Sequence, residues 1–118
     1  MLKYSDLERF TDERERLNEI VFKYAALPAK RFFSLDGQAY RDEGILPGKY
    51  KELMGLTASL VLRCDDCIKY HVMQAFKEGV TDEEFAETTG IALVVGGSIV
   101  IPHLRRAAEI WDVLKEKK

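Results

Sequence analysis

Residues 47–79 read PGKYKELMGLTASLVLRCDDCIKYHVMQAFKEG, and this stretch predicts two α-helices joined by a very short connection. Pro47 suits the first turn of the first helix, because the N–H that proline lacks would have no partner there. The apolar side chains of this helix recur at helical spacing and predict a buried stripe of Leu53, Leu56, Leu60 and Val61. The second helix begins at about Cys64 or Asp65 and stops at Gly79, a residue type that commonly ends helices. So short a connection predicts an antiparallel helical hairpin.

Helical patterns continue on the N-terminal side of this hairpin. Ser5 and Glu8 have the spacing of a capping box, which predicts that a helix starts beside them. Apolar residues then recur mostly at helical spacing as far as Tyr24. Pro28 predicts the first turn of another helix, which we expect to end near Gly44.

Two more helices are expected after the hairpin. Thr81 and Glu84 form a second capping-box pattern, and the helix that follows runs toward Gly96–Gly97. Ser98 is the expected cap of the last helix. Pro102 is expected either to lie in the first turn of this helix or to kink it. The side chains of this helix that we expect to face inward are Leu104, Ala107, Ala108, Trp111 and Leu114.

The predicted fold class is all-α, because no segment shows the sustained two-residue alternation of a strand. A chain of 118 residues without a visible linker or repeat fits a single domain, and we expect about six helices over residues 1–118. A hydrophobic content of 47% with 32% charged residues is typical of a globular protein rather than a disordered one.

The charge balance bears on the partners of the chain. Eighteen basic and twenty acidic residues give 18 − 20 = −2, which argues against nucleic acid, whose phosphates require a concentrated positive field. The most apolar run, residues 91–101, is shorter than the roughly 20 residues that cross a bilayer, so no membrane partner is expected. No secretory leader is visible at residues 1–10, and we therefore expect a cytoplasmic protein.

The residues that carry chemistry lie at the start of the second helix of the hairpin. Cys64, Cys67 and His71 occupy positions i, i+3 and i+7, which share one face of a helix. Two thiols one turn apart can close a disulfide with little backbone movement. The free N–H groups and the dipole of a helix N-terminus favour a thiolate, and an imidazole one turn further on can take up the thiol proton. In a cytoplasmic protein such a pair is more often redox-active or metal-binding than structural.

The roles of the two thiols follow from their distance to the imidazole. His71 is one turn from Cys67 and two turns from Cys64, which favours Cys67 as the attacking thiolate and Cys64 as the resolving thiol. Asp65 and Asp66 suit a helix N-terminus, but their charge opposes thiolate formation. The sequence leaves open which of these two effects prevails.

A carboxylate from the first helix of the hairpin is expected beside the imidazole. Glu52 lies eleven residues before Arg63, at the pivot, and His71 lies eight residues after it. At about 1.5 Å per residue, the two side chains differ in height by roughly 4–5 Å. Glu52 could therefore share a pocket with His71 and the thiols, where it would orient the imidazole or relay a proton. Taken without a family resemblance, Glu52 would be read as an exposed helix residue.

The pattern of Glu, eleven residues, Cys, two residues, Cys, three residues, His resembles the signature of the carboxymuconolactone decarboxylase superfamily, in its alkylhydroperoxidase D-like (AhpD-like) branch. Glu52, Cys64, Cys67 and His71 satisfy it, and residues 46–97 resemble the core of the family. The resemblance includes Lys51-Glu52-Leu53, residues 77–84 (KEGVTDEE) and the Gly-Gly pair.

This resemblance implies an AhpD-like all-α fold and a homo-oligomer, commonly a trimer or a hexamer. It also implies antioxidant reduction of a peroxide or a disulfide by the thiols, with an unidentified thiol electron donor and neither an organic cofactor nor a metal. In that scheme Cys67 attacks, Cys64 resolves the sulfenic acid as a disulfide, and Glu52 and His71 relay protons. The family peroxidase has a histidine just before its second cysteine, and this chain has Asp66 there. Because of this difference, general disulfide reduction stays an alternative to peroxide reduction.

Other functions remain as alternatives. The cysteines and His71 supply three zinc ligands, but a closed structural site needs four, and neither His103 nor Asp66 is well placed by spacing. A lactone decarboxylase would need a basic pocket, and the motif has only Arg63 as a nearby arginine in the sequence. His103 itself is interpreted as a structural residue.

An oligomer is also expected on physical grounds. Residues 91–101 are apolar on all sides, more than one face of a small bundle can bury.

Overall fold

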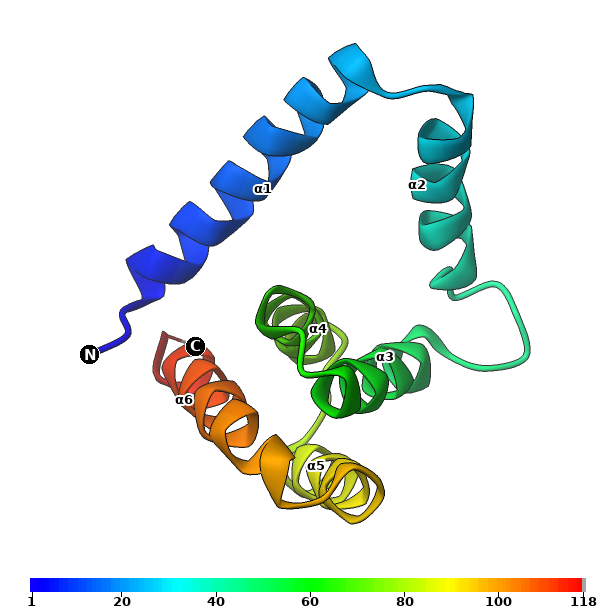
Figure 1. Cartoon of the computed structure of the whole chain (residues 1–118). Helices are drawn as coiled ribbons and strands as arrows, with labels where there is room; N and C mark the ends of the chain where they lie inside the picture. Colours follow the sequence, from blue (N-terminus) through cyan, green and yellow to red (C-terminus); the bar gives the residue numbers. More distant parts are fainter. Residues whose placement is uncertain (118) are drawn as a thin grey trace. The chain divides into compact units, whose positions relative to one another are not determined.

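The computed structural model describes residues 1–117, and within these residues every regular element is a helix. The elements are α1 (Tyr4–Tyr24), α2 (Leu27–Ala39), α3 (Gly48–Leu62), α4 (Asp65–Lys77), α5 (Asp82–Gly96), the 3₁₀ turn η1 (Ser98–Val100) and α6 (Ile101–Lys117) (Figure 1). The predicted all-α fold with about six helices is confirmed.

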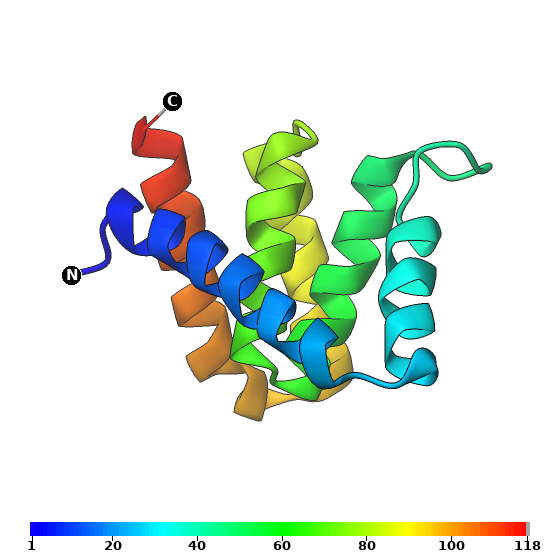
Figure 2. The same cartoon turned by 90° about the horizontal axis from the view of Figure 1, so that it is seen from above.

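The contacts divide the chain into two compact units, the first being Met1–Arg41 and the second beginning at Asp42. The expected single domain over residues 1–118 therefore stays a prediction. In the first unit, α1 and α2 meet at a connection of two residues (Figure 2). Phe22 of α1 packs edge-to-face on Phe33 of α2, with ring centroids 4.9 Å apart.

Two helix boundaries in the first unit differ from expectation. The Ser5–Glu8 capping box does not start α1, because the helix begins one residue before Ser5, at Tyr4. Asp6 instead accepts a hydrogen bond from the backbone N–H of Lys3 at 2.8 Å, which satisfies that donor. α2 has Pro28 in its first turn, as predicted, but ends at Ala39 rather than near Gly44. A turn follows at once, in which the N–H of Arg41 donates to the carbonyl of Gln38.

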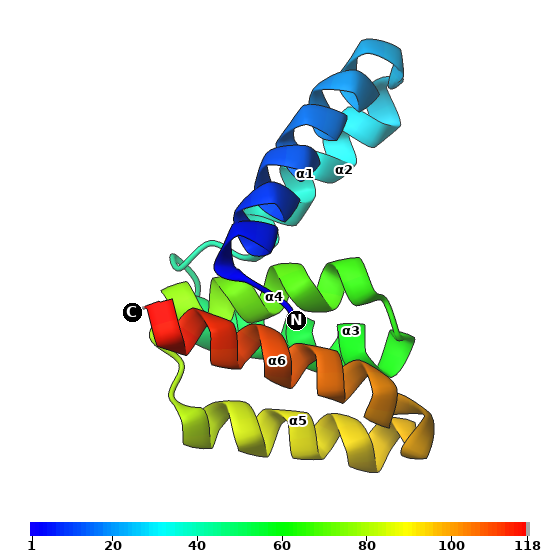
Figure 3. The same ribbon diagram turned by 90° about the vertical axis from the view of Figure 1, so that its left-hand side faces the viewer.

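The second unit holds four long helices that lie side by side. α3 packs against both α4 and α5, and α4 also packs against α6. Figures 1 and 3 show α3 between α4 and α5. The core consists of apolar side chains from all of these elements, among them Leu56, Leu60, Ile68, Val72, Phe85, Ala92, Val100, Ala107 and Ile110. Each large side chain of this kind contributes about 1.5–3 kcal/mol by leaving water.

The connection from α4 to α5 follows the predicted turn chemistry. Gly79 has a φ of 81°, a conformation that glycine adopts without strain, and it ends α4 as expected. At the start of α5, Thr81 Oγ1 accepts from the backbone N–H of Glu84 at 3.1 Å. Glu84 Oε1 accepts in return from the N–H of Thr81 at 2.9 Å. The predicted capping box is thus confirmed.

The C-terminal helix differs in detail from the prediction. Ser98 does not cap α6 directly, because residues 98–100 form the turn η1 and α6 begins at Ile101. Pro102 lies in the first turn, as expected. Ala108 is exposed, whereas Ile110, which the pattern missed, is buried.

Trp111 joins α6 to the two helices beside it. Its ring stacks on Phe85 of α5 at 4.6 Å and meets Phe76 of α4 edge-on at 5.5 Å. Its Nε1–H donates to Asp82 Oδ1 at 2.8 Å, and Lys115 Nζ donates to the other oxygen of this carboxylate. The bonds from Lys115 and Trp111 lower the pKa of Asp82 below its usual value.

Across residues 1–117, none of the helices has both the length and the apolar character needed to cross a membrane.

Candidate active site

The α3–α4 connection places the two cysteines at the start of a helix. Arg63 ends α3 with a φ of 60° and a ψ of 43°, in the left-handed region, and is the only non-glycine residue with positive φ among residues 1–117. This conformation reverses the chain within two residues, so that α4 can begin directly after Cys64. The antiparallel hairpin expected from residues 47–79 therefore forms.

Cys64 and Cys67 are joined by a disulfide, and their Cα atoms are 5.3 Å apart. Cys64 is the N-cap of α4, and its sulfur accepts a hydrogen bond from the backbone N–H of Cys67 at 3.3 Å. Cys67 is exposed, whereas Cys64 is half-buried. The pair is therefore able to form a disulfide within one turn, and Cys67 is the thiol more open to a reactant from solvent.

Glu52 and His71 form a buried pair between α3 and α4. Glu52 Oε1 lies 2.8 Å from Nδ1 of His71, and the two residues are only 6% and 9% exposed. The expected shared pocket of Glu52 and His71 is thus present, and the two side chains are in direct contact. A carboxylate at this distance accepts the Nδ1 proton, which leaves Nε2 as the nitrogen that can exchange a proton with a reactant. His71 is four residues after Cys67 in α4, so both side chains lie on the same face, one turn apart.

Asp65, the first residue of α4, is bound by α6. His103 Nδ1 lies 2.8 Å from Asp65 Oδ1, and Arg106 Nη2 lies 3.2 Å from Asp65 Oδ2. The hydrogen bond from His103 lowers the pKa of Asp65 most, and the bond and charge of Arg106 lower it further, while partial burial opposes them. Asp66 is exposed. This cluster was not expected from the sequence, where Arg63 is the only arginine near the motif, and the fold adds Arg106 from a distant part of the chain.

A signal for this cluster was present in the sequence. His103 and Arg106 are three residues apart and therefore share one face of a helix. What the sequence did not supply was the position of that face relative to α4. In this structure Arg106 is already paired with a carboxylate, so it adds no support to a basic pocket for lactone carboxylates. Within residues 1–117, no group of three or more His, Cys, Asp and Glu side chains is arranged to hold a metal ion.

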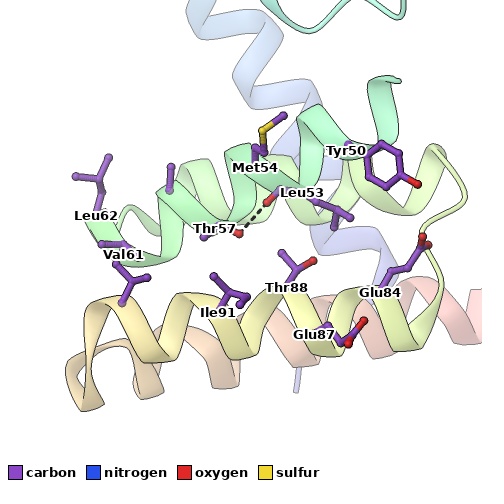
Figure 4. Close-up of a pocket in the computed structure, with 12 residues that line it drawn as sticks. Tyr50, Leu53, Met54, Thr57, Val61, Leu62, Glu84, Glu87, Thr88 and Ile91 are labelled. Carbon is purple, nitrogen blue, oxygen red and sulfur yellow. Dashed lines mark hydrogen bonds between the residues drawn. The ribbon is translucent and has the colours of Figure 1, made fainter. Parts of the chain in front are cut away.

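An apolar groove of about 820 Å³ lies between α3 and α5, on the side of α3 away from His71. Figure 4 shows that side chains of α3 such as Leu53 and Val61 face Ile91 and Thr88 of α5. Thr57 lies between them and uses its hydroxyl to donate to the carbonyl of Leu53 at 3.0 Å. The cysteines and the Glu52–His71 pair are not among its lining residues, so the groove is separate from the candidate site.

A model of the carboxymuconolactone decarboxylase family matches residues 26–109. Because this match covers more than half of the chain, the protein belongs to the carboxymuconolactone decarboxylase family. The family expected from the four-residue signature is confirmed, and the match extends on both sides of the core predicted at residues 46–97.

Solved structures agree with this assignment. A crystal structure of a Thermotoga maritima protein is 55% identical to this chain and matches it with a TM-score of 0.90. The match covers 93% of this chain and 96% of the Thermotoga maritima chain. Another Thermotoga maritima structure is 56% identical to this chain, with a TM-score of 0.87. The match covers 92% of this chain and 91% of the other chain. This structure is described as that of a carboxymuconolactone decarboxylase family protein with a suggested part in an antioxidative response.

More distant relatives also span most of the chain. The crystal structure of a carboxymuconolactone decarboxylase family protein from Legionella pneumophila is 30% identical to this chain, with a TM-score of 0.75. The match covers 94% of this chain and 96% of the Legionella pneumophila chain. An uncharacterised protein of Cupriavidus necator is 31% identical over 109 residues, which are 88% of this chain and 96% of that protein. The all-α fold is therefore that of solved members of the family.

Proposed function

We propose that the protein is a thiol-dependent peroxidase with Cys67 as its nucleophile. The observation that carries the proposal is the buried bond between Glu52 and His71, on the same hairpin as a cysteine pair that can close a disulfide. A buried, oriented imidazole one turn from an exposed cysteine is suited to proton exchange with that thiol. The antioxidative role suggested for the Thermotoga maritima relative is consistent with this chemistry.

The reaction starts from the reduced pair. His71 takes the proton of Cys67, and the thiolate attacks the terminal oxygen of a hydroperoxide ROOH. The O–O bond breaks, Cys67 becomes a sulfenic acid, and the proton held by His71 passes to the departing oxygen, which leaves as ROH. Cys64 then attacks the sulfur of Cys67, so that the disulfide forms and water leaves with the thiol proton.

A dithiol donor closes the cycle by thiol–disulfide exchange. Its two thiols are oxidised to a disulfide while Cys64 and Cys67 are reduced, so that the sum is ROOH + R′(SH)₂ → ROH + R′S₂ + H₂O. Glu52 keeps the imidazole in one orientation and tautomer throughout. None of these steps uses an organic cofactor or a metal, and we place the activity in the reducing environment of the cytoplasm.

General disulfide reduction is a second candidate, which the position of Asp66 favours. This exposed carboxylate stands where the family peroxidase has a histidine, so the chain has one basic group fewer beside Cys67. The same thiols would then act on a disulfide substrate instead of a peroxide.

The test is turnover of an organic hydroperoxide with dithiothreitol by the wild type, Cys67→Ser and Cys64→Ser. We expect Cys67→Ser to abolish turnover, and Cys64→Ser to form a trappable sulfenic acid without an internal disulfide. Equal rates for the wild type and Cys67→Ser would disprove the assignment of the nucleophile. Turnover of a disulfide but not of the hydroperoxide would select the second candidate.

We also propose that copies of this chain assemble through the apolar surface of α5 and the adjoining groove. Ile91, Val94 and Val95 are 58%, 84% and 67% exposed, a large amount of apolar surface for one helix to leave in water. A second copy of the chain, presenting the same surface, would cover it, and the family resemblance implies a trimer or a hexamer. Light scattering should give an oligomeric mass that Val94→Glu lowers, while Ile45→Glu, at a 98% exposed position outside this surface, leaves it unchanged. A monomeric wild type would contradict the proposal.

A further inference from the structure

The first turn of α4 carries a negative charge at Asp65, close in sequence to both cysteines. Asp65 follows Cys64 in the chain and precedes Cys67 by two residues. A bare carboxylate there would oppose the formation of a thiolate in either cysteine, because two negative charges at short range repel. Asp65 is about half exposed, so water alone would only partly screen this repulsion.

Two side chains from a distant part of the chain meet this carboxylate. His103 lies against Oδ1 at 2.8 Å, while Arg106 reaches Oδ1 through Nε at 3.3 Å and Oδ2 through Nη2 at 3.2 Å. Both side chains come from the same face of α6. Both carboxylate oxygens are therefore occupied, and the guanidinium supplies a full positive charge.

We propose that Arg106 and His103 are positioning residues for Asp65: Arg106 neutralises its charge, His103 holds it by a hydrogen bond, and together they keep a thiolate accessible in the Cys64–Cys67 pair at neutral pH. They act through Asp65 and need not touch a substrate. They also hold the first turn of α4, whose N–H groups favour the thiolate, against α6. The inference rests on the proposed redox function, because it concerns the electrostatics of the same thiols.

The equilibrium between the disulfide and the reduced form of the pair tests the inference. Reduction of the disulfide by a reference dithiol moves two electrons to Cys64 and Cys67, and the dithiol is oxidised to its own disulfide. At a pH where part of the reduced pair is thiolate, an uncompensated Asp65 disfavours the reduced form. Loss of Arg106 should therefore shift this equilibrium toward the Cys64–Cys67 disulfide.

The experiment compares Arg106→Gln with Arg105→Gln in the full chain. Arg105 is the exposed neighbour in α6, so its loss removes the same charge without touching the Asp65 cluster. Each protein is equilibrated with a series of reduced and oxidised dithiothreitol at pH 8, and the disulfide fraction is measured by alkylation and mass spectrometry. We expect Arg106→Gln to favour the disulfide by about threefold to tenfold, the effect of one charge at short range that water screens in part. Arg105→Gln should have little effect.

The Asp65→Asn background separates electrostatics from structural damage. With no carboxylate to neutralise, Arg106→Gln should have no further effect on the equilibrium in this background. With Asp65 present, Arg106→Lys should keep most of the wild-type value, because it retains the positive charge. If Arg106→Gln does not fold, His103→Gln is measured in both backgrounds and should shift the equilibrium in the same direction.

Two results would overturn the inference. One is an equal shift for Arg105→Gln and Arg106→Gln, and the other is an Arg106→Gln shift that persists with Asn at position 65. A wild-type pair that cannot be reduced and reoxidised at all would instead reject the proposed redox function, so the two failures are distinguishable.

Discussion

The Oε1 atom of Glu52 and the Nδ1 atom of His71 lie 2.8 Å apart in the interior of the α3–α4 hairpin. This bond engages Nδ1 of the imidazole and leaves Nε2 for the proposed reaction. In the proposed reaction this contact supplies the cysteines with an oriented proton acceptor.

Substitutions of Glu52 and His71 should slow peroxide turnover, and their effects should not be additive. We expect His71→Asn to lower the rate by about a hundredfold or more, in the range of general acid–base catalysis, and Glu52→Gln to cause a smaller loss. Because Glu52 acts through His71, the double variant should be no slower than His71→Asn alone. Steady-state rates of the three variants provide the check. A double-variant rate equal to the product of the two separate losses would contradict this coupling.

Core packing around the motif should be costly to disturb. Ile68 is 1% exposed, whereas Ile45 is 98% exposed, so the same truncation to alanine can be compared in both environments. We expect Ile68→Ala to lower the free energy of unfolding by about 2–5 kcal/mol, and Ile45→Ala to change it by less than about 0.5 kcal/mol. Urea denaturation followed by circular dichroism measures both. Similar losses in the two variants would show that Ile68 does not lie in a packed core.

Acid should weaken the junction of α5 and α6 through Asp82. Its pKa is lowered by the hydrogen bonds from Lys115 and Trp111, so the stability it contributes is complete above the ordinary carboxyl pKa of about 4. That contribution is lost as the pH falls through the lowered value. We expect Asp82→Asn to flatten the decline in stability below about pH 4.

Glu83→Gln is the matched control for this titration, because Glu83 is an exposed carboxylate in the same first turn of α5. It should keep the slope of the wild type. Urea denaturation at a series of pH values gives the slopes, and an equal flattening in both variants would assign the effect to the helix terminus instead of to the contacts of Asp82.

Two glycines of α5 should respond in opposite directions to a methyl group. A Cβ at Gly96 would lie 2.5 Å from Cγ2 of Val100, whereas a Cβ at Gly90 would have no neighbour within 4 Å. Gly96→Ala should therefore destabilise the protein by about 1–3 kcal/mol through overpacking. Gly90→Ala should stabilise it by about 0.5–1 kcal/mol, because alanine is the better helix former. Thermal unfolding of both variants tests the pair, and a stabilised Gly96→Ala would disprove the close contact.

The sequence indicated that Glu52 and His71 could share a pocket, because one short connection joins the two helices, and the family resemblance favoured a functional Glu52. With a pivot at Arg63 and a fixed rise per residue, the heights of both side chains follow from counting. The same local logic predicted the Thr81–Glu84 capping box and the end of α4 at Gly79. It failed at Ser5, where the nearby carboxylate of Asp6 satisfies the donor instead.

The Asp65 cluster could not be predicted in this way. His103 lies 38 residues after Asp65, and no short connection fixes the rotation of α6 about its axis relative to α4. That rotation depends on how side chains such as Ala107 and Trp111 fill the core, which is a property of the packed molecule. The exposed surface of α5 raised the same difficulty, because the apolar pattern of residues 91–101 did not show which side chains remain in water.

The sulfur of Cys64 also serves as the acceptor that caps α4, since the amide of Cys67 donates to it. A thiolate accepts such a bond more strongly than a disulfide sulfur does, because its charge is greater. Each turnover would therefore tighten and then loosen the opening of this helix. The rate of deuterium uptake at the backbone amide of Cys67 should therefore report whether Cys64 and Cys67 are oxidised or reduced, without any added dye or substrate.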